Sequence, residues 1–341
     1  MKKLYIALLL SLGISVSHAQ DFHLSQYDAA ALNFNPAMTG MFKGMYRVHG
    51  HYRTQWSAVS TKPFTTGIIS FDMPVKKLSL GLQVANFRAG AGLYNVFSPM
   101  LSLAYDSKLD KNGIHHLSLG VQGGGFQKSL NYNLLNFETQ FVNSNGGGFN
   151  TSISNGEAFA SNSVLIPDLN AGFVYYYAKD GVRLNPFAGA AVFHINQPKE
   201  SFFGADNRLP MRIVGHAGAK INLTERIQLL AKGLYMTQQE AREMTFSLHG
   251  HFYFKDNDTY IIAGPTVRVS NSVINDIDYK NLDAMIMEVG IKWKKIIYRL
   301  SYDVNISTLQ PSTNGRGGLE MSLTYIPIKY NPNPVKTCPR L

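Results

Sequence analysis

The sequence has little cysteine, little charge and no long apolar segment beyond its start. Cys338 is the single cysteine in 341 residues, which excludes an internal disulfide framework and a cysteine-rich zinc or iron–sulfur site. Only 16% of residues are charged and 12% are aromatic, the reverse of a disordered composition. After the N-terminus no apolar run reaches the roughly 18 residues that a transmembrane helix needs. These absences also exclude a helical membrane protein.

The first residues have the pattern of a secretory signal peptide. Lys2 and Lys3 precede a mostly apolar stretch over residues 4–16, and small residues follow at the positions that define a cleavage site. We expect residues 1–19 to be removed, which leaves Gln20 rather than a cysteine at the new N-terminus and excludes a lipoprotein anchor there. The net charge of +10 would suit nucleic acid, but export from the cytoplasm argues against nucleic acid as a partner.

Beyond residue 45 the dominant pattern is an alternation of residue types with a period of two. In the stretch Tyr46 to Trp56, one face is aromatic and apolar, whereas the other carries only arginine, histidine and glutamine. Comparable segments run for about 10–13 residues, whereas an ordinary strand has about 5–6. Long strands with one apolar and one polar face are typical of an outer-membrane barrel, in which lipid contacts the apolar face and a polar lumen the other.

About fourteen such segments follow one another along the chain. They lie near residues 45–56, 63–74, 77–87, 94–106, 113–126, 167–178, 182–195, 210–222, 225–237, 242–255, 258–270, 283–293, 295–306 and 317–328. Connections after even-numbered segments are short, and those after odd-numbered ones are mostly longer, such as 127–166, 196–209, 271–282 and 307–316. Short periplasmic turns and longer extracellular loops are typical of a single-chain barrel with both termini in the periplasm.

The predicted fold is therefore all-β: a transmembrane outer-membrane β-barrel of about 14 antiparallel strands over residues 45–328. Residues 20–44 lack the alternation and are rich in turn formers, which predicts an N-terminal arm or plug segment. Residues 329–341 contain three prolines, which disfavour a strand, so we expect a short periplasmic C-terminal tail.

The residues give little support to catalysis or metal binding. The pairs His49/His51 and His249/His251 each place two rings on one face of a strand, a spacing that can chelate a metal. No carboxylate or cysteine lies beside either pair, and a polar lumen produces the same pattern. No Gly-x-Ser-x-Gly motif is present, and no spacing singles out a nucleophile with its base. We expect no enzyme, no metal and no cofactor.

Charged residues on the inward faces of the first and the last three predicted strands are more informative. Charge is costly in lipid and tolerated in a polar lumen, so these side chains should point inward. They could brace the seam where the first and last strands meet, which is the favoured interpretation, or bind a segment inserted by a partner. With their polar neighbours and the histidine pairs, the candidate lumen or partner-binding residues are Arg47, His49, His51, Arg53, Gln55, His249, His251, Glu288, Arg299, Asp303 and Glu320.

Several motifs, taken together, point to a known family. They are Ser25-Gln26-Tyr27, Asn33-Phe34-Asn35-Pro36-Ala37, Tyr52-Arg53-Thr54-Gln55-Trp56, Pro63-Phe64, Asp72-Met73-Pro74, Pro167-Asp168-Leu169-Asn170 and Cys338-Pro339-Arg340. With these motifs the chain resembles, over nearly its whole mature length, the PorP/SprF family of outer-membrane proteins associated with the type IX secretion system. Phe34 within the Asn-Pro element and the final Leu341 depart from the family pattern, so no role is carried over to the last residue.

The resemblance implies a non-enzymatic barrel in the cell outer membrane of a Gram-negative bacterium. Such a barrel would aid secretion or cell-surface anchoring of specific large adhesin-like cargo proteins, in some cases with gliding motility. Its expected partners are outer-membrane lipid, a secreted cargo protein and type IX secretion or periplasmic anchoring components. The family offers no catalytic residues to carry over. The alternative hypothesis is an outer-membrane transport channel, fatty-acid-transporter-like or porin-like, for a small solute.

Overall fold

The computed structural model describes residues 21–57, 62–90, 92–143, 147–179, 181–204, 206–254, 259–274, 277–308 and 310–327, without the side chains of 272–281. The expected signal peptide and the expected C-terminal tail lie outside these residues. Within them, the few helices are too short to cross a membrane.

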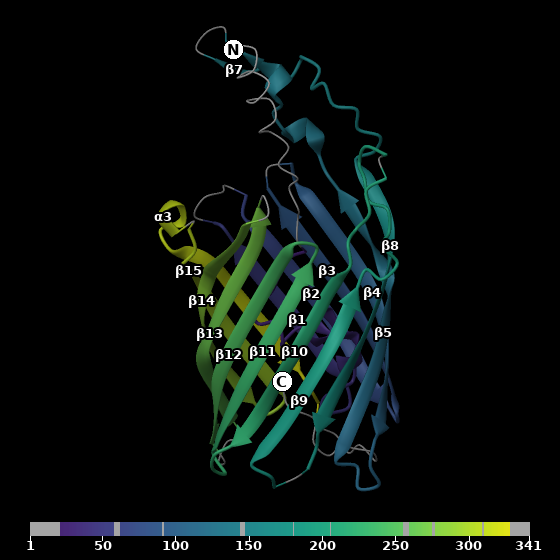
Figure 1. Cartoon of the computed structure of the whole chain (residues 1–341), viewed down its shortest axis with the longest axis vertical. Coiled ribbons are helices and arrows are strands. Elements are labelled where there is room, and N and C mark those ends of the chain that lie inside the picture. The colour runs from purple at the N-terminus through teal and green to yellow at the C-terminus, as the bar shows by residue number, and fades with distance from the viewer. Residues whose placement is uncertain are drawn as a thin grey trace.

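The chain forms one closed antiparallel barrel (Figure 1), in which each barrel strand pairs with the next and β1 pairs with β16 to close the ring. Its fourteen strands are β1 Arg47–Gln55, β2 Phe64–Val75, β3 Leu78–Ala89, β4 Tyr94–Lys108, β5 His115–Ser129, β8 Ser163–Tyr177, β9 Leu184–Phe193, β10 Arg212–Asn222, β11 Ile227–Gln238, β12 Ala241–Phe254, β13 Thr259–Ile274, β14 Ile277–Trp293, β15 Ile296–Asn305 and β16 Arg316–Tyr325. Each overlaps one predicted segment. The predicted all-β outer-membrane barrel of about 14 antiparallel strands is thereby confirmed.

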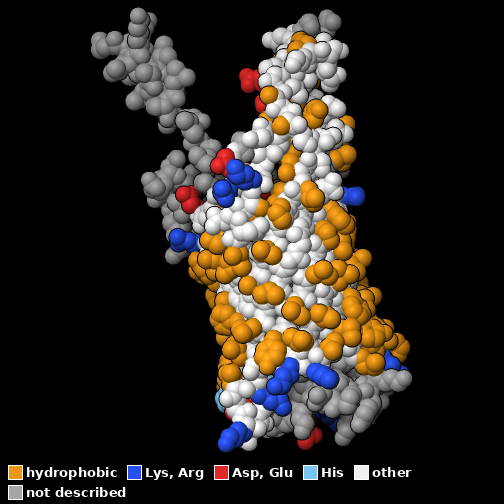
Figure 2. Space-filling model, turned by 90° about the vertical axis from the view of Figure 1, so that its right-hand side faces the viewer, with side chains coloured by type: hydrophobic (Ala, Val, Ile, Leu, Met, Phe, Trp, Pro, Cys, Tyr) orange, Lys and Arg blue, Asp and Glu red, His pale blue; other side chains and the backbone are white. Residues whose placement is uncertain are grey.

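The alternation along the strands separates a lipid-facing surface from an inner one. On β3, Leu78, Leu80 and Leu82 are exposed, whereas Ser79 and Gln83 are buried toward the inside. On the face that Figure 2 shows, the outward side chains form an apolar belt, with lysine and arginine at its lower edge. A belt of this kind is the surface that an outer-membrane barrel presents to lipid.

The two ends of the barrel differ in the length of their connections. At the end where β16 stops, β2 joins β3 and β14 joins β15 through two residues each. At the opposite end, residues 130–162 form a long projection that carries η2 Tyr132–Leu134, η3 Glu138–Gln140 and the hairpin of β6 Phe141–Val142 with β7 Gly148–Phe149 (Figure 1). We call these the short-turn end and the long-loop end. Barrel architecture assigns the short-turn end to the periplasm.

One expected long loop is a strand hairpin instead. Residues 271–282 were expected to form an extracellular loop, but β13 continues to Ile274 and β14 begins at Ile277, past a register shift between Arg268 and Val269. Pairing can continue there because backbone hydrogen bonds alone sustain a ladder beyond the lipid, where the outer face need not be apolar. The polar sequence of this stretch therefore hid the strands.

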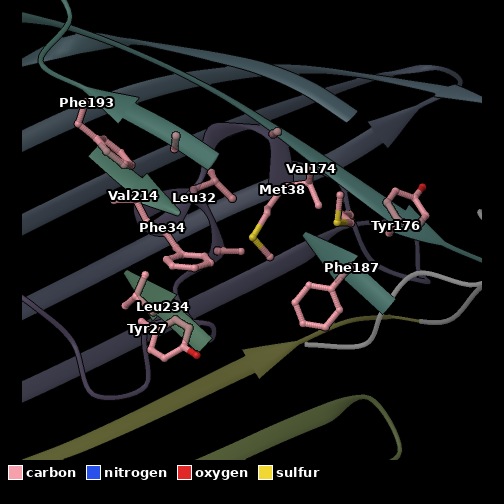
Figure 3. Packing of buried hydrophobic residues seen from close by; sticks show 14 of the residues in the cluster. Tyr27, Leu32, Phe34, Met38, Val174, Tyr176, Phe187, Phe193, Val214 and Leu234 are labelled. Carbon is pink, nitrogen blue, oxygen red and sulfur yellow. The ribbon is translucent and has the colours of Figure 1, made fainter. Parts of the chain in front are cut away.

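Residues 21–46, which we call the N-terminal segment, lie inside the barrel. The segment contains α2 Ala31–Phe34 and η1 Pro36–Met38, and the Asn35 side chain caps η1 by accepting a hydrogen bond from the Ala37 N–H. Figure 3 shows its apolar side chains packed against inward residues of β8 to β11, in a cluster that includes Leu32, Phe34, Met38, Val174, Tyr176, Phe187, Phe193, Val214 and Leu234. Protein atoms therefore fill the lumen at this depth.

The wall of the barrel is shaped to receive this segment. A Cβ atom at Gly120 of β5 would lie 2.3 Å from the Ala37 nitrogen, and one at Gly172 of β8 would lie 2.2 Å from Asn35 Oδ1. Both distances are too short for any side chain. Glycine at these positions is the condition for the close approach of segment and wall.

The N-terminal segment runs along the lumen from the long-loop end to the short-turn end. The Asp21 N–H donates to Gln238 Oε1 at the long-loop end of β11, and the Met45 N–H donates to the Pro327 carbonyl just beyond β16. Both termini were expected at the periplasmic end. The barrel sequence ends there with β16, but Asp21 lies at the opposite end because its charge partners, described below, are located there.

The apolar belt gives a direct test of which face contacts lipid. Leu101, in the middle of β4, is 67% exposed, whereas Leu109 is 56% exposed in the turn just after that strand. Leu101→Arg should cost about 2–4 kcal/mol of folding free energy in lipid, and Leu109→Arg about 0–1 kcal/mol. Urea-induced unfolding in lipid vesicles measures both, and equal costs would contradict the assignment.

Candidate functional site

The charged residues near the seam form a buried cluster together with the N-terminal segment. The Arg53 guanidinium on β1 donates to Glu320 Oε2 of β16 at 2.7 Å and to Asp303 Oδ2 of β15 at 2.9 Å. It also donates to the Ser25 hydroxyl at 2.6 Å, and that hydroxyl lies 2.7 Å from Asp303 Oδ1. Arg268 of β13 adds a second guanidinium, 3.2 Å from Asp303. The cluster thus joins four strands to the segment.

Glu320 holds the backbone of the N-terminal segment. Its two carboxylate oxygens accept hydrogen bonds from the N–H groups of Ser25 and Gln26 at 2.8 and 2.7 Å. His51 Nε2 lies 2.7 Å from the same carboxylate, whose side chain is fully buried. The Gln26 side-chain amide donates to Ser301 Oγ and accepts from Ser322 Oγ. It is therefore hydrogen-bonded to both β15 and β16.

A second buried cluster surrounds Asp28. Its carboxylate lies 2.5 Å from Lys232 Nζ of β11 and accepts from Arg299 of β15 at 2.8 Å. Arg299 also donates to both oxygens of Glu288 at 2.6 and 2.9 Å. The positive charges of Lys232 and Arg299 thus compensate the buried carboxylate of Asp28. The segment is thereby tied to the opposite side of the lumen too.

Arg47 and Asp72 form the third contact, close to the short-turn end. The Arg47 guanidinium donates to both oxygens of Asp72 at 2.9 and 2.8 Å and to the Met38 carbonyl at 3.2 Å. Asp72 in turn accepts from the Gly40 N–H at 2.7 Å. A bidentate arginine–carboxylate pair is geometrically specific, so it fixes the exit of the segment toward β1.

His194 holds the start of the segment at the long-loop end. It lies just beyond β9 with a φ of 58°, a strained backbone conformation for a residue with a side chain. Its Nδ1 is 2.8 Å from Asp168 and its Nε2 is 2.7 Å from Asp21, and Arg212 is 3.5 Å from the same Asp21 oxygen. Burial lowers the pKa of His194, but hydrogen bonds to Asp168 and Asp21 outweigh it and raise this pKa to about 8.

The histidine pairs serve mainly as hydrogen-bonding groups of the inner wall. His49 Nδ1 lies 2.8 Å from Thr324 Oγ1, and His249 Nε2 lies 3.2 Å from Thr266 Oγ1. One carboxylate lies near each pair, Glu320 at 2.7 Å from His51 and Glu288 at 3.7 Å from His249, but no described group of three or more histidine, cysteine or acidic side chains could hold a metal ion. His251 is half-buried and borders the cavity analysed below.

The structure groups the residues named from sequence around the N-terminal segment. Arg53, His51, Asp303 and Glu320 share one cluster, with Gln55 at its edge, 3.2 Å from the Arg53 guanidinium. Eight further residues take part in these contacts and were not among the candidates from the sequence: Ser25, Gln26, Asp28, Asp72, Lys232, Arg268, His194 and Asp168. Alternation on β11 and β13 places Lys232 and Arg268 inward and could have indicated them, whereas the N-terminal segment has no period that reveals its partners.

Comparison with known proteins gives one family and a general architecture. The model of the family described as "Type IX secretion system membrane protein PorP/SprF" matches residues 16–325. No curated protein matches the chain significantly.

Solved structures with a similar architecture include outer-membrane channels. The CymD monoaromatic hydrocarbon channel is 11% identical with a TM-score of 0.48, over 89% of this chain and 94% of that one. An outer-membrane channel from Pseudomonas putida F1 is 9% identical with a TM-score of 0.43, over 90% and 100%. These low values carry no argument about what the barrel binds or transports.

The geometry at His194 predicts a pH dependence of stability. A pKa raised to about 8 in the folded state, against about 6.5 in the unfolded chain, stabilises the fold fully below pH 6.5, and this stabilisation is lost as pH rises through 8. The free energy of unfolding in lipid, measured with urea from pH 6 to 9, should therefore fall over this interval. His194→Gln should flatten the fall, and an unchanged pH profile in that variant would contradict the prediction.

Proposed function

Because the chain belongs to the PorP/SprF family of type IX secretion system membrane proteins, we propose that it aids secretion or cell-surface anchoring of specific large adhesin-like cargo proteins. It is an outer-membrane barrel and associates with components of that secretion system and with the membrane. In this proposal the barrel has no enzymatic role. Gliding motility would depend on it only where the cargo is a motility adhesin.

The observation that carries this proposal is the occupied lumen. The N-terminal segment is anchored by His194 and Arg212 at its start, by the Glu320 and Asp28 clusters in its middle, and by Arg47 and Asp72 near its exit. Protein charges that are buried and paired in this way are expensive to separate. A segment held in this way obstructs straight diffusion along the lumen, which favours a role at the surface of the barrel over a role as an open diffusion pore.

The long-loop end offers a surface suited to a protein partner. The rings of Tyr132, Phe159 and Phe203 stack with centroid separations of 4.6 and 4.7 Å, and they join the projection to the loop after β9. Phe141 and Phe149 of the β6–β7 hairpin are both about half exposed, far from the apolar belt (Figure 1). Exposed aromatic groups outside the lipid region are typical of protein interaction sites.

Surface proteomics of a deletion strain tests the proposal. Loss of the gene should remove one or a few large proteins from the cell surface while other type IX cargo is still exported. Complementation with Phe141→Ser/Phe149→Ser should fail to restore them, whereas Asp206→Asn, which removes only an exposed loop ion pair with Lys199, should restore them.

The transport alternative makes the opposite prediction for the same strain. If surface proteins were unchanged and uptake of one small solute fell, the chain would be a channel and the secretion role would be wrong. Full rescue of the surface proteins by the double serine variant would exclude the hairpin as the cargo contact.

A further inference from the structure

A cavity of about 270 Å³ lies in the lumen near the short-turn end, between the N-terminal segment and strands β11 to β16. It reaches Lys294 and Lys295, the two residues that join β14 to β15. Asp28, Arg47 and Arg299, which hold the segment, lie in the wall of this cavity. Their ion pairs leave its volume unfilled. Its volume is just below the range of about 300–1,000 Å³ typical of small-ligand pockets, so it suits part of an extended chain rather than a folded domain.

The charged side chains around the cavity are predominantly positive. Lys43, Arg47, Lys292, Lys294, Lys295 and Arg299 line it, and Asp28 is the single acidic residue among the described lining residues. Asp28 is already paired with Lys232 and Arg299, and Arg47 is paired with Asp72. In the part of the chain that the structure describes, the amines of Lys43, Lys294 and Lys295 take part in no ion pair, and all three residues are exposed. The positive charges of these three lysines are therefore not balanced by a described carboxylate.

The remaining wall is partly apolar, and Gln228, His249, His251 and Thr324 supply its neutral polar groups. Met41 and Phe42 of the N-terminal segment face Leu230, Ile262 and Ile297 across the cavity. Tyr260 adds an aromatic ring, with Lys292 Nζ 5.3 Å from its centroid. An apolar wall beside a group of cations matches a ligand that carries carboxylates next to apolar side chains.

Other occupants fit this chemistry less well. The chain's own residues 328–341 carry Lys329, Lys336 and Arg340 and no acidic side chain, so their charge has the same sign as that of the cavity. Lipid is separated from the cavity by the barrel wall, because the lining residues of β11 to β15 point inward. An acidic chain that approaches from the periplasm has charge opposite to that of the cavity, and it does not have to cross the barrel wall.

We propose that this cavity is a docking site for an acidic, partly apolar peptide segment of a periplasmic protein. The carboxylates of the segment pair with Lys43, Lys294 and Lys295, while its apolar side chains contact Phe42 and Ile262. The site lies at the opposite end of the barrel from the aromatic hairpin and goes beyond the proposed cargo role. The purified barrel can test it without any cargo.

Peptide binding to the barrel in zwitterionic nanodiscs tests the proposal. The probe is a fluorescein-labelled octapeptide of alternating glutamate and leucine, and the control probe has lysine in place of glutamate. The acidic probe should bind, and its affinity should fall with added salt because exposed charges are screened. The lysine probe should not bind.

Two charge reversals at the same end of the barrel locate the site. Lys43→Glu/Lys295→Glu should weaken binding of the acidic probe at least about tenfold, since it replaces two attractions by repulsions. Lys77→Glu lies in the β2–β3 turn, exposed and outside the cavity lining, and should leave the affinity within about twofold. Circular dichroism of all variants verifies that the barrel is folded.

Three results would overturn the proposal. Binding of both probes alike would show that charge does not select the ligand. Equal weakening by Lys77→Glu and by the double reversal would show a diffuse surface effect in place of a site. In parallel nanodiscs that contain phosphatidylglycerol, loss of binding of this lipid on Lys43→Glu/Lys295→Glu, without any change for the acidic probe, would assign these lysines to lipid.

Discussion

The carboxylate of Glu320 is the contact on which the rest of the interior depends. It is fully buried on the last strand, and its partners among the described residues are Arg53, His51 and the backbone N–H groups of Ser25 and Gln26. Removal of one partner from a buried charged group typically costs about 3–5 kcal/mol, because the charge that remains has no water to solvate it. The last strand and the N-terminal segment therefore require each other.

Because of this dependence, the same charged residues both join the first and last strands at the seam and hold the N-terminal segment. Arg53 and Asp303 pair across β1, β16 and β15, as expected for a braced seam, yet both also contact the Ser25 hydroxyl. The segment that these residues contact in the structure is the chain's own N-terminal segment, whereas the sequence suggested a brace of the seam or a segment inserted by a partner. Glycines at 120 and 172 complete the fit on the far wall, where any side chain would collide with Asn35 or Ala37.

The strands could be predicted from the sequence because lipid imposes a strict rule on every second residue. The prediction failed where β13 continues to Ile274 and β14 begins at Ile277, because the residues of this stretch do not show the alternation and were expected to form a loop. Alternation also gave the inward direction of Arg47, Arg53, Arg299 and Glu320, because it depends on position along one strand.

Their partners could not be predicted from the same pattern. Ser25, Gln26 and Asp28 belong to a segment without periodicity, and their contacts span more than 200 residues of sequence. The direction of the segment is set by Asp21 with His194 and Arg212, three residues that meet only in the folded barrel. The basic cavity likewise combines Lys43 of the segment with Lys294 and Lys295 of the β14–β15 turn.

The central claim is that the N-terminal segment closes the lumen, and ion conductance in planar bilayers tests it most directly. The intact barrel should show no steady current, because the packed segment and its paired charges leave no continuous water path. A chain with its signal peptide but without residues 21–40, checked by circular dichroism for strand content, should conduct steadily. A steady current through the intact barrel, equal to that of the deletion, would contradict the claim.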